Sequence, residues 1–134
     1  MAAPVHVLCV DDDDAVLRAI RRVFHGMPWH VTCVSDPIAA SALLQAGGID
    51  ILLTDQGMPR LSGIALCARA RECDPAIIRI LLTGSFDRVS ANEAVAAGLA
   101  ECVIEKPWES AHLRRVIAEY VAVVEHRSAA RGAG

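Results

Sequence analysis

The stretch "VHVLCVDDDDAVLRAI", residues 5–20, joins an apolar run to an amphipathic segment through four consecutive aspartates. Residues 5–10 are almost all apolar, which predicts a short strand buried on both faces. From residue 13 onward, apolar side chains recur at intervals of three and four, which predicts a helix. Four adjacent carboxylates repel one another unless a cation, a basic side chain or water compensates them. The question is therefore which groups the rest of the chain brings to this turn.

The strand–helix alternation of the first 24 residues recurs four more times along the chain. Short apolar runs predict strands, and segments with helical periodicity and capping signals follow each of them. The later strands are predicted at residues 30–34, 50–55, 76–84 and 101–105, and the helices at residues 13–24, 35–48, 64–73, 87–98 and 109–126. This alternation predicts an α/β fold, in which helices cover both faces of a parallel sheet through right-handed crossovers.

Length and composition restrict the class of protein. The chain has 134 residues, of which 54% are hydrophobic and 22% are charged, and its formal net charge is -3. These values favour one globular domain over a disordered chain. Because the basic residues are dispersed, we expect no direct contact with nucleic acid. No apolar run approaches the roughly 20 residues of a membrane span, and the N-terminus lacks a signal-peptide pattern, so we expect a cytoplasmic protein without membrane association.

The cysteines agree with a reducing compartment. Five are present, which is an odd number, and none forms a CxxC pair. Cys9, Cys33 and Cys102 fall inside apolar runs that are typical of strands, where a thiol behaves as a small hydrophobe. We interpret all five as structural or incidental rather than as metal ligands or disulfide partners.

Chemically useful side chains stand at the ends of four predicted strands. They are Asp11, Asp12, Asp55, Thr83 and Lys106. In open α/β sheets the functional crevice lies at the carboxyl ends of the strands, so we expect these groups to converge at one edge. Asp13 and Asp14 need no such partner, because acidic residues at a helix start are favoured by capping and by the helix dipole.

This set of residues suits magnesium-dependent phosphoryl transfer. Mg²⁺ prefers oxygen ligands, which the carboxylates of Asp11, Asp12 and Asp55 and the backbone carbonyl of Gly57 can supply. A carboxylate such as Asp55 can attack phosphorus and become an aspartyl phosphate. The Lys106 ammonium would then offset charge on the phosphoryl oxygens, and the Thr83 hydroxyl could donate to one of them.

These residues in this order resemble the receiver domain of bacterial two-component response regulators. The resemblance extends from "VLCVDDD" through "ILLTDQGMPRLSG" and "RILLTG" to "EKPW" and the last helix. It implies that Asp55 is the phosphoacceptor, that Asp11 and Asp12 hold Mg²⁺ or Mn²⁺, and that Thr83 is the hydroxyl switch. It also implies a flavodoxin-like doubly wound (βα)5 fold with strand order 2-1-3-4-5, and it makes Pro107 a candidate for a cis peptide bond.

The same resemblance implies how the domain is used. We expect residues 1–126 to form the receiver domain and residues 127–134 to form a flexible tail or the start of a linker. The phosphodonor is expected to be a sensor histidine kinase or a phosphotransfer protein. An effector is expected on the surface formed by the fourth helix, fifth strand and fifth helix, together with a phosphorylation-dependent dimer. The domain is not expected to be an enzyme beyond its own phosphorylation and dephosphorylation.

One position departs from the family pattern. Receivers usually carry Tyr or Phe three residues before the lysine, and its ring turns inward when the domain is phosphorylated. Here that residue is Val103, whose short, branched side chain cannot swing a ring between exposed and buried states. We therefore expect signalling to use Phe86, in the segment that follows Thr83, or to change partner affinity without a large rearrangement.

Two other classes of protein share parts of this pattern. A haloacid-dehalogenase-type phosphatase also has a strand that ends in Asp-x-Asp, but that family expects a further acidic pair after the lysine and a longer chain. A pseudo-receiver is a protein-binding module that has usually lost an acid, the acceptor or the lysine, whereas this chain keeps all of them. Steady turnover of p-nitrophenyl phosphate would support the phosphatase. Failure to take up phosphate from acetyl phosphate with Mg²⁺ would support the pseudo-receiver.

Overall fold

Five parallel strands form the centre of the structure, a computed structural model that describes residues 3–133. The strands are β1 (His6–Val10), β2 (His30–Val34), β3 (Ile51–Asp55), β4 (Ile78–Thr83) and β5 (Cys102–Glu105). Their order across the sheet is β2-β1-β3-β4-β5, and every neighbouring pair is parallel. This confirms the predicted doubly wound fold. The connections reverse direction between β1 and β3, which is where such sheets form their functional crevice.

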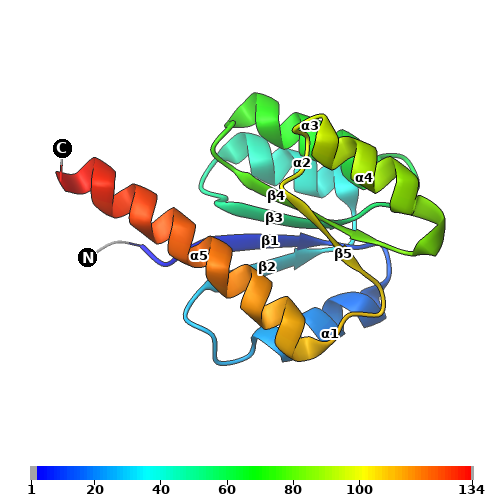
Figure 1. Ribbon diagram of the computed structural model, residues 1–134, viewed down its shortest axis with the longest axis horizontal. Coiled ribbons are helices and arrows are strands. Elements are labelled where there is room, and N and C mark those ends of the chain that lie inside the picture. The colour runs from blue at the N-terminus through cyan, green and yellow to red at the C-terminus, as the bar shows by residue number, and fades with distance from the viewer. Residues whose placement is uncertain (1–2, 134) are drawn as a thin grey trace.

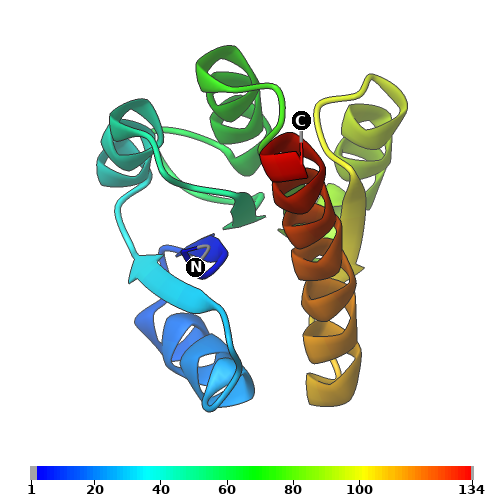
Figure 2. The ribbon, with the colours of Figure 1, turned by 90° about the vertical axis from the view of Figure 1, so that its left-hand side faces the viewer.

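Helices cover both faces of the sheet (Figures 1 and 2). The helices are α1 (Asp14–Phe24), α2 (Pro37–Ala46), α3 (Gly63–Cys73), α4 (Arg88–Ala96) and α5 (Ser110–Ala133), with a short 3-10 turn, η1 (Ser85–Asp87), before α4. Figure 2 shows α1 and α5 on one side of the sheet and α2, α3 and α4 on the other. None of the helices within residues 3–133 is long and apolar enough to cross a membrane.

The core lies in two layers, one on each face of the sheet. Successive strand residues point to opposite faces, so a strand that is covered on both sides is apolar at every position. In β1, Val7 and Cys9 pack in the layer below α1 and α5, whereas Leu8 and Val10 pack in the layer below α2, α3 and α4. All four side chains are fully buried. Burial on both faces of the sheet explains why residues 5–10 are almost all apolar.

Aspartate side chains cap two of the helices. Asp13 accepts a hydrogen bond from the Ala15 amide at 2.9 Å and is the N-cap of α1, as predicted. Asp36 accepts from the Ile38 amide at 2.9 Å and caps α2. Such caps satisfy amides that have no partner in the first helical turn, and each is worth about 1 kcal/mol. The Asp13 carboxylate therefore has a capping role in the fold, which distinguishes it from Asp11 and Asp12.

Helix α5 is longer than the sequence suggested. It continues to Ala133, whereas we expected the last helix to end at residue 126, before a flexible tail or the start of a linker. The structure thus corrects the expected end of the helix, and residue 134 lies outside the described part of the chain. Alanine and arginine, which dominate this segment, are strong helix formers. Arg127 also donates a hydrogen bond to the Ala76 carbonyl at 3.0 Å, which holds the helix beside the segment that leads into β4.

A buried arginine interrupts the apolar strand β4, and sequence reasoning assigned it no role. Arg79 is 4% exposed, and its guanidinium donates to the carbonyls of Leu99 at 2.8 Å, Ile77 at 3.1 Å and Gly98 at 3.2 Å. A buried charge is tolerated when its hydrogen-bonding capacity is filled in this way. Arg79 therefore ties the first residues of β4 to the loop between α4 and β5.

Candidate functional site

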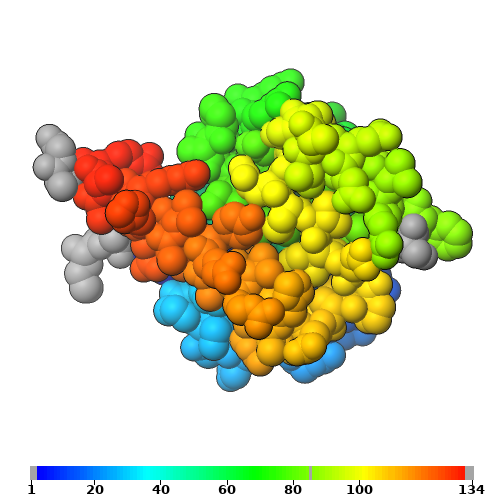
Figure 3. All heavy atoms as spheres, in the orientation of Figure 1, coloured from blue at the N-terminus to red at the C-terminus, as the bar shows by residue number. Residues whose placement is uncertain are grey.

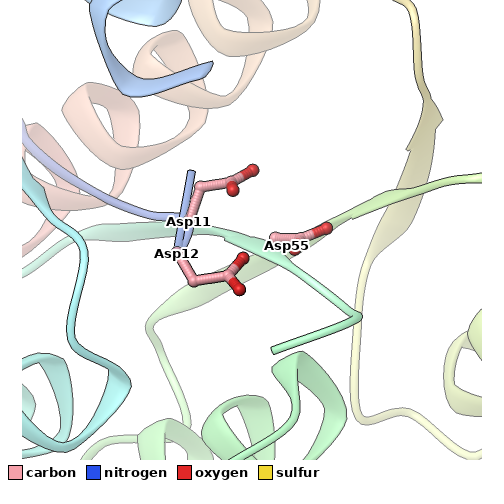
Figure 4. Close-up of side chains that lie close together, drawn as sticks. All are labelled: Asp11, Asp12 and Asp55. Carbon is pink, nitrogen blue, oxygen red and sulfur yellow. The ribbon is translucent and has the colours of Figure 1, made fainter. Parts of the chain in front are cut away.

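Three carboxylates meet at the carboxyl edge of the sheet (Figure 4). Asp11 and Asp12 follow β1, and Asp55 ends β3, the neighbouring strand. One carboxylate oxygen from each of the three lies within 4.8 Å of the other two. Asp11 and Asp55 are buried, whereas Asp12 is exposed. The structure thus brings together the three acids that the sequence pattern placed at one edge.

Lys106, which follows β5, contacts two of these carboxylates. Its Nζ donates to Asp11 Oδ2 at 2.8 Å and to Asp55 Oδ1 at 2.9 Å. Lys106 is the only lysine in the sequence, and it stands directly after β5. The peptide bond from Lys106 to Pro107, the candidate named from the sequence, is cis. One ammonium therefore bridges the buried acids that end two neighbouring strands.

The charges at this edge do not balance. Burial raises the pKa of Asp11, and it outweighs the hydrogen bonds from Lys106 and from the Asp13 amide, which lower it. Burial alone would lower the pKa of Lys106, but its hydrogen bonds to Asp11 and Asp55 reverse the effect and raise that pKa. Lys106 consequently keeps its charge at neutral pH. A single ammonium faces three acids, which leaves a negative field that favours additional positive charge.

Thr83 stands at the same edge, at the end of β4 and beside β3. It is 1% exposed, and its Oγ1 donates to the Gly84 carbonyl at 3.0 Å. Its register partner in β5 is Glu105, the residue before Lys106. The five side chains predicted to converge therefore all occupy one edge of the sheet, at the ends of β1, β3, β4 and β5.

The loop after Asp55 is held in place by residues that sequence reasoning did not single out. The Gln56 amide donates to the Leu82 carbonyl at 3.0 Å, and Gln56 Oε1 accepts from the Ile64 amide at 2.8 Å. A Cβ atom at Gly63 would lie 2.2 Å from the backbone oxygen of Asp55, so only glycine allows α3 to begin this close to β3. In the sequence, only a glycine directly before the predicted helix pointed to this position. The reason for the glycine, which is the close contact between α3 and β3, appears only in the fold.

Gly57 lies in this loop, near a further carboxylate. A Cβ atom at Gly57 would lie 3.2 Å from Asp87 Oδ2. We expected Asp87 to open the fourth helix, and it does hold the N-cap position of α4, but its side chain makes no capping hydrogen bond. The Asp87 carboxylate instead lies beside Gly57, whose backbone carbonyl is a predicted metal ligand. A side chain at position 57 would therefore crowd Asp87.

The two candidate switch residues differ sharply in exposure. Phe86, in η1, is 100% exposed, whereas Val103 in β5 is half-buried and packs against the core layer below α4. Arg88, two residues after Phe86, forms an exposed ion pair at 2.7 Å with Glu105, two residues after Val103. In Figure 3, α4, β5 and α5 form one continuous surface. This is the surface on which we expect an effector to bind.

A largely apolar hollow of about 520 Å³ lies beside the acidic edge. Its lining comes from α1 and from the segment after β5: Ala15, Val16, Ala19, Lys106, Pro107 and Trp108. Trp108 also packs against the core layer below α1 and α5. Lys106 thus borders both the acidic cluster and an accessible surface.

Comparisons with known proteins agree on one family. The model of the response regulator receiver domain matches residues 7–118. The chain is 34% identical over 119 residues to the hydrogenase transcriptional regulatory protein HoxA of Bradyrhizobium diazoefficiens, which covers 86% of this chain and 24% of that protein. It is 33% identical over 113 residues to the response regulator receiver protein CpdR of Brucella abortus, with 84% of this chain and 91% of that protein covered.

Solved structures show the same architecture. The REC domain of AraT, a response regulator from Geobacillus stearothermophilus, superposes with a TM-score of 0.84 and 26% sequence identity. The match covers 94% of this chain and 99% of that one. The chain spans about a quarter of the length of HoxA but nearly all of CpdR. The similarity therefore concerns one domain, which occurs both within longer proteins and nearly alone.

Proposed function

This chain belongs to the receiver domain family of two-component response regulators, and on that premise we propose that Asp55 accepts a phosphoryl group in a Mg²⁺-dependent reaction. The observation that carries the proposal is the position of Lys106, whose Nζ contacts both Asp11 and Asp55. A phosphoryl group on Asp55 would place its oxygens beside this ammonium. The proposed donor is a phosphohistidine on a sensor histidine kinase or on a phosphotransfer protein.

The acidic edge fits a hard divalent cation. Asp11, Asp12 and Asp55 offer carboxylate oxygens within 4.8 Å of one another, and Gly57 can add its backbone carbonyl. Mg²⁺ is usually held by one or two carboxylates together with water and phosphate oxygens, and Mn²⁺ accepts the same donors. When bound, such a cation supplies positive charge that offsets the carboxylates and the phosphoryl oxygens.

The residues of the chain take separate roles in the transfer. A carboxylate oxygen of Asp55 attacks phosphorus, the bond from phosphorus to the donor nitrogen breaks, and that electron pair stays on the donor imidazole. Lys106 donates hydrogen bonds to the oxygens that gain charge, and Thr83 moves its hydroxyl toward another of them. The product is an aspartyl phosphate at the end of β3. Its formation is the signal that the rest of the domain transmits.

Stoichiometry separates this function from the alternatives. With acetyl phosphate and Mg²⁺, the intact mass of the chain is expected to rise by one phosphoryl group, and without Mg²⁺ it is expected to stay unchanged. A pseudo-receiver would take up no phosphate under either condition. A haloacid-dehalogenase-type phosphatase would instead release p-nitrophenol continuously from p-nitrophenyl phosphate, beyond one equivalent per chain.

Mg²⁺ is expected to raise the melting temperature of the parent chain. A ligand that binds only the native state adds about 2.7 kcal/mol to the free energy of unfolding at 100 times its dissociation constant. Asp12→Asn should reduce this stabilisation, because Asp12 is a proposed ligand and, being exposed, contributes little to the core. Differential scanning fluorimetry across a Mg²⁺ titration measures the effect.

Asp14→Asn is the matched control for that titration. Asp14 is also exposed and lies in the same acidic run, but it is the first residue of α1 and not part of the acidic cluster. This variant should keep the Mg²⁺ response of the parent. A melting temperature that is independent of Mg²⁺ in the parent would contradict the metal site, as would an equal loss in both variants.

The proposed output surface comprises α4, β5 and α5 (Figure 3), with Phe86 as the responsive side chain. Phe86 is three residues from Thr83 and fully exposed, so it is free to gain contacts when the Thr83 hydroxyl moves. Beryllofluoride, which mimics the phosphoryl group, is therefore expected to change amide hydrogen exchange around η1. Phe86→Ala should reduce this change, whereas Val103→Ala should leave it largely intact.

The reverse pattern would refute this route. If the protection changes centre on β5, vanish in Val103→Ala and survive in Phe86→Ala, then Val103 rather than Phe86 carries the response. An effector, or a second copy of the chain in a phosphorylation-dependent dimer, would be expected to contact the same α4–β5–α5 surface. Coupling of about 1–3 kcal/mol between phosphorylation and such binding is enough for a switch.

A further inference from the structure

Two cysteines outside the acidic cluster are paired across neighbouring strands. Cys9 of β1 and Cys33 of β2 are direct register partners in the parallel pair. Both side chains pack in the core layer below α1 and α5, so they lie on the same face of the sheet. Neighbouring strands lie about 4.7–4.9 Å apart, and the Cα atoms of disulfide-bonded cysteines usually lie about 4.4–6.8 Å apart. The two thiols, which are free in the structure, are therefore placed within bridging range.

The two thiols differ in access to solvent. Cys9 is fully buried, whereas Cys33 is half-buried on β2, the edge strand of the sheet. Cys33 also lines a surface hollow of about 220 Å³, together with Asp14, Leu17, Arg18, Arg21 and Ser35. A small reagent can thus reach Cys33 directly. Cys9 is reached only through its partner.

The surroundings of Cys33 also favour its ionised form. Interaction with the Cys9 thiol, helped by the positive charge of Arg21, lowers the pKa of Cys33 to about 7. At neutral pH Cys33 consequently carries a substantial fraction of thiolate, the nucleophilic form. The accessible member of the pair is the reactive one.

We propose that Cys33 and Cys9 form a peroxide-sensitive dithiol, in which Cys33 reacts with a hydroperoxide and Cys9 resolves the product into a disulfide. The Cys33 sulfur attacks one peroxide oxygen, the O–O bond breaks, and the leaving hydroxide takes up a proton to become water. Cys33 is then a sulfenic acid. The Cys9 sulfur attacks the Cys33 sulfur, the S–O bond breaks, and the hydroxyl leaves as water with the proton from Cys9. The two thiols lose two electrons and two protons in total, and hydrogen peroxide is reduced to two waters.

The bridge would lie immediately below the acidic edge. Cys9 is two residues before Asp11, and the Asp11 amide donates to the carbonyl of Val34, the residue after Cys33, at 3.4 Å. A parallel pair holds its side chains at about the strand spacing, which is wider than a relaxed disulfide prefers between Cβ atoms. A strained disulfide is readily reduced, which suits a reversible modification rather than a structural bond. This proposal does not depend on phosphorylation of Asp55.

The remaining cysteines provide internal controls. Burial raises the pKa of Cys67 to about 12, and burial also raises that of Cys102, so both thiols stay protonated at neutral pH. Cys73 is exposed at the end of α3 and is the competing site of oxidation. Replacing Cys73 with serine removes this competition without touching either strand of the pair.

A peptide map of the folded, peroxide-treated chain tests the proposal. After treatment with hydrogen peroxide, free thiols are alkylated in denaturant and the chain is digested with trypsin without reduction. Cys9 lies in the tryptic peptide of residues 1–18 and Cys33 in that of residues 23–60, and each peptide contains no other cysteine. We expect these two peptides to be linked, with the loss of two hydrogens, and to separate on addition of dithiothreitol. Cys73→Ser should give the same linked pair.

The intermediate can be tested separately. In Cys9→Ser the hydroxyl can still donate a hydrogen bond to Cys33 but cannot resolve its sulfenic acid, so dimedone should label Cys33 in the oxidised variant but not in the oxidised parent. Full alkylation of both Cys9 and Cys33 in the oxidised parent would overturn the proposal, as would oxidation confined to Cys73. The parent and Cys73→Ser maps decide the question by themselves if Cys9→Ser does not fold.

Discussion

The Asp55→Asn variant takes up no phosphoryl group from acetyl phosphate and Mg²⁺ under conditions in which the parent chain takes up one. The amide of asparagine has nearly the shape of the carboxylate but is not a nucleophile toward phosphorus, so the transfer step is lost entirely. The substitution also withdraws one charged partner from Lys106, whose Nζ lies 2.9 Å from Asp55 Oδ1 in the parent. Intact-mass spectrometry of the two chains, treated in parallel, measures the difference.

Asp14→Asn is the control for this result, because it makes the same change from aspartate to asparagine at a position outside the acidic cluster. It should be phosphorylated like the parent. Circular dichroism of each variant establishes that the fold is intact. A phosphoryl adduct of equal amount on Asp55→Asn would show that another residue is the acceptor, and the assignment of Asp55 would be wrong.

Lys106→Met is expected to change phosphoryl uptake and metal affinity in opposite directions. The ammonium is the one lysine charge in the chain, and its loss removes the hydrogen-bond donor placed to meet the phosphoryl oxygens. Loss of one such preorganised donor typically slows a reaction by about 100-fold to 1,000-fold, and we expect uptake from acetyl phosphate to slow by a factor in that range. Methionine keeps the unbranched apolar length of the side chain, so packing is largely preserved.

Metal binding should become tighter in the same variant. Lys106 repels a cation and occupies oxygens of Asp11 and Asp55, so its removal leaves a more negative site. A gain on the order of tenfold in Mg²⁺ affinity corresponds to about 1.4 kcal/mol, a reasonable value for removing one nearby charge from a partly solvated site. Titration of the melting temperature and single-turnover phosphorylation measure the two effects independently.

Arg88→Met is the control for Lys106→Met, because Arg88 is an exposed cation near the same strand end and pairs with Glu105 rather than with the acidic cluster. It should leave both quantities near the parent values. If Lys106→Met lost Mg²⁺ affinity, or if it took up phosphate at the parental rate, the roles given to Lys106 would be incorrect.

The convergence of Asp11, Asp55 and Lys106 could be predicted from the sequence because it depends only on parallel strands. Residues at the carboxyl ends of parallel strands reach one edge of the sheet whatever the details of packing. The two-sided burial of β1, β3 and β4 follows from the same architecture, and it makes the apolar runs easy to recognise. Local rules also identified Asp13 as a residue of a helix start, since a cap requires only its own first turn.

Features that depend on tertiary contacts could not be predicted in this way. In the sequence, Arg79 is a charged residue inside an apolar strand. Only the fold shows that its guanidinium donates hydrogen bonds to backbone carbonyls of two loops. The length of α5 depends on the contact of Arg127 with the segment before β4 as well as on helix propensity. The carboxylate of Asp87 lies beside Gly57, 30 residues earlier in the chain, and makes no capping hydrogen bond to α4. In each case the deciding partner is distant in sequence.

Chemical mapping of the phosphorylated residue tests the central claim most directly. Borohydride reduces an aspartyl phosphate to homoserine, so treatment of the phosphorylated parent chain marks the acceptor permanently. Peptide sequencing by tandem mass spectrometry is expected to find homoserine at position 55, only after incubation with acetyl phosphate and Mg²⁺. Homoserine at any of the other aspartates in place of position 55, or its absence from a chain that gained phosphate, would contradict the account.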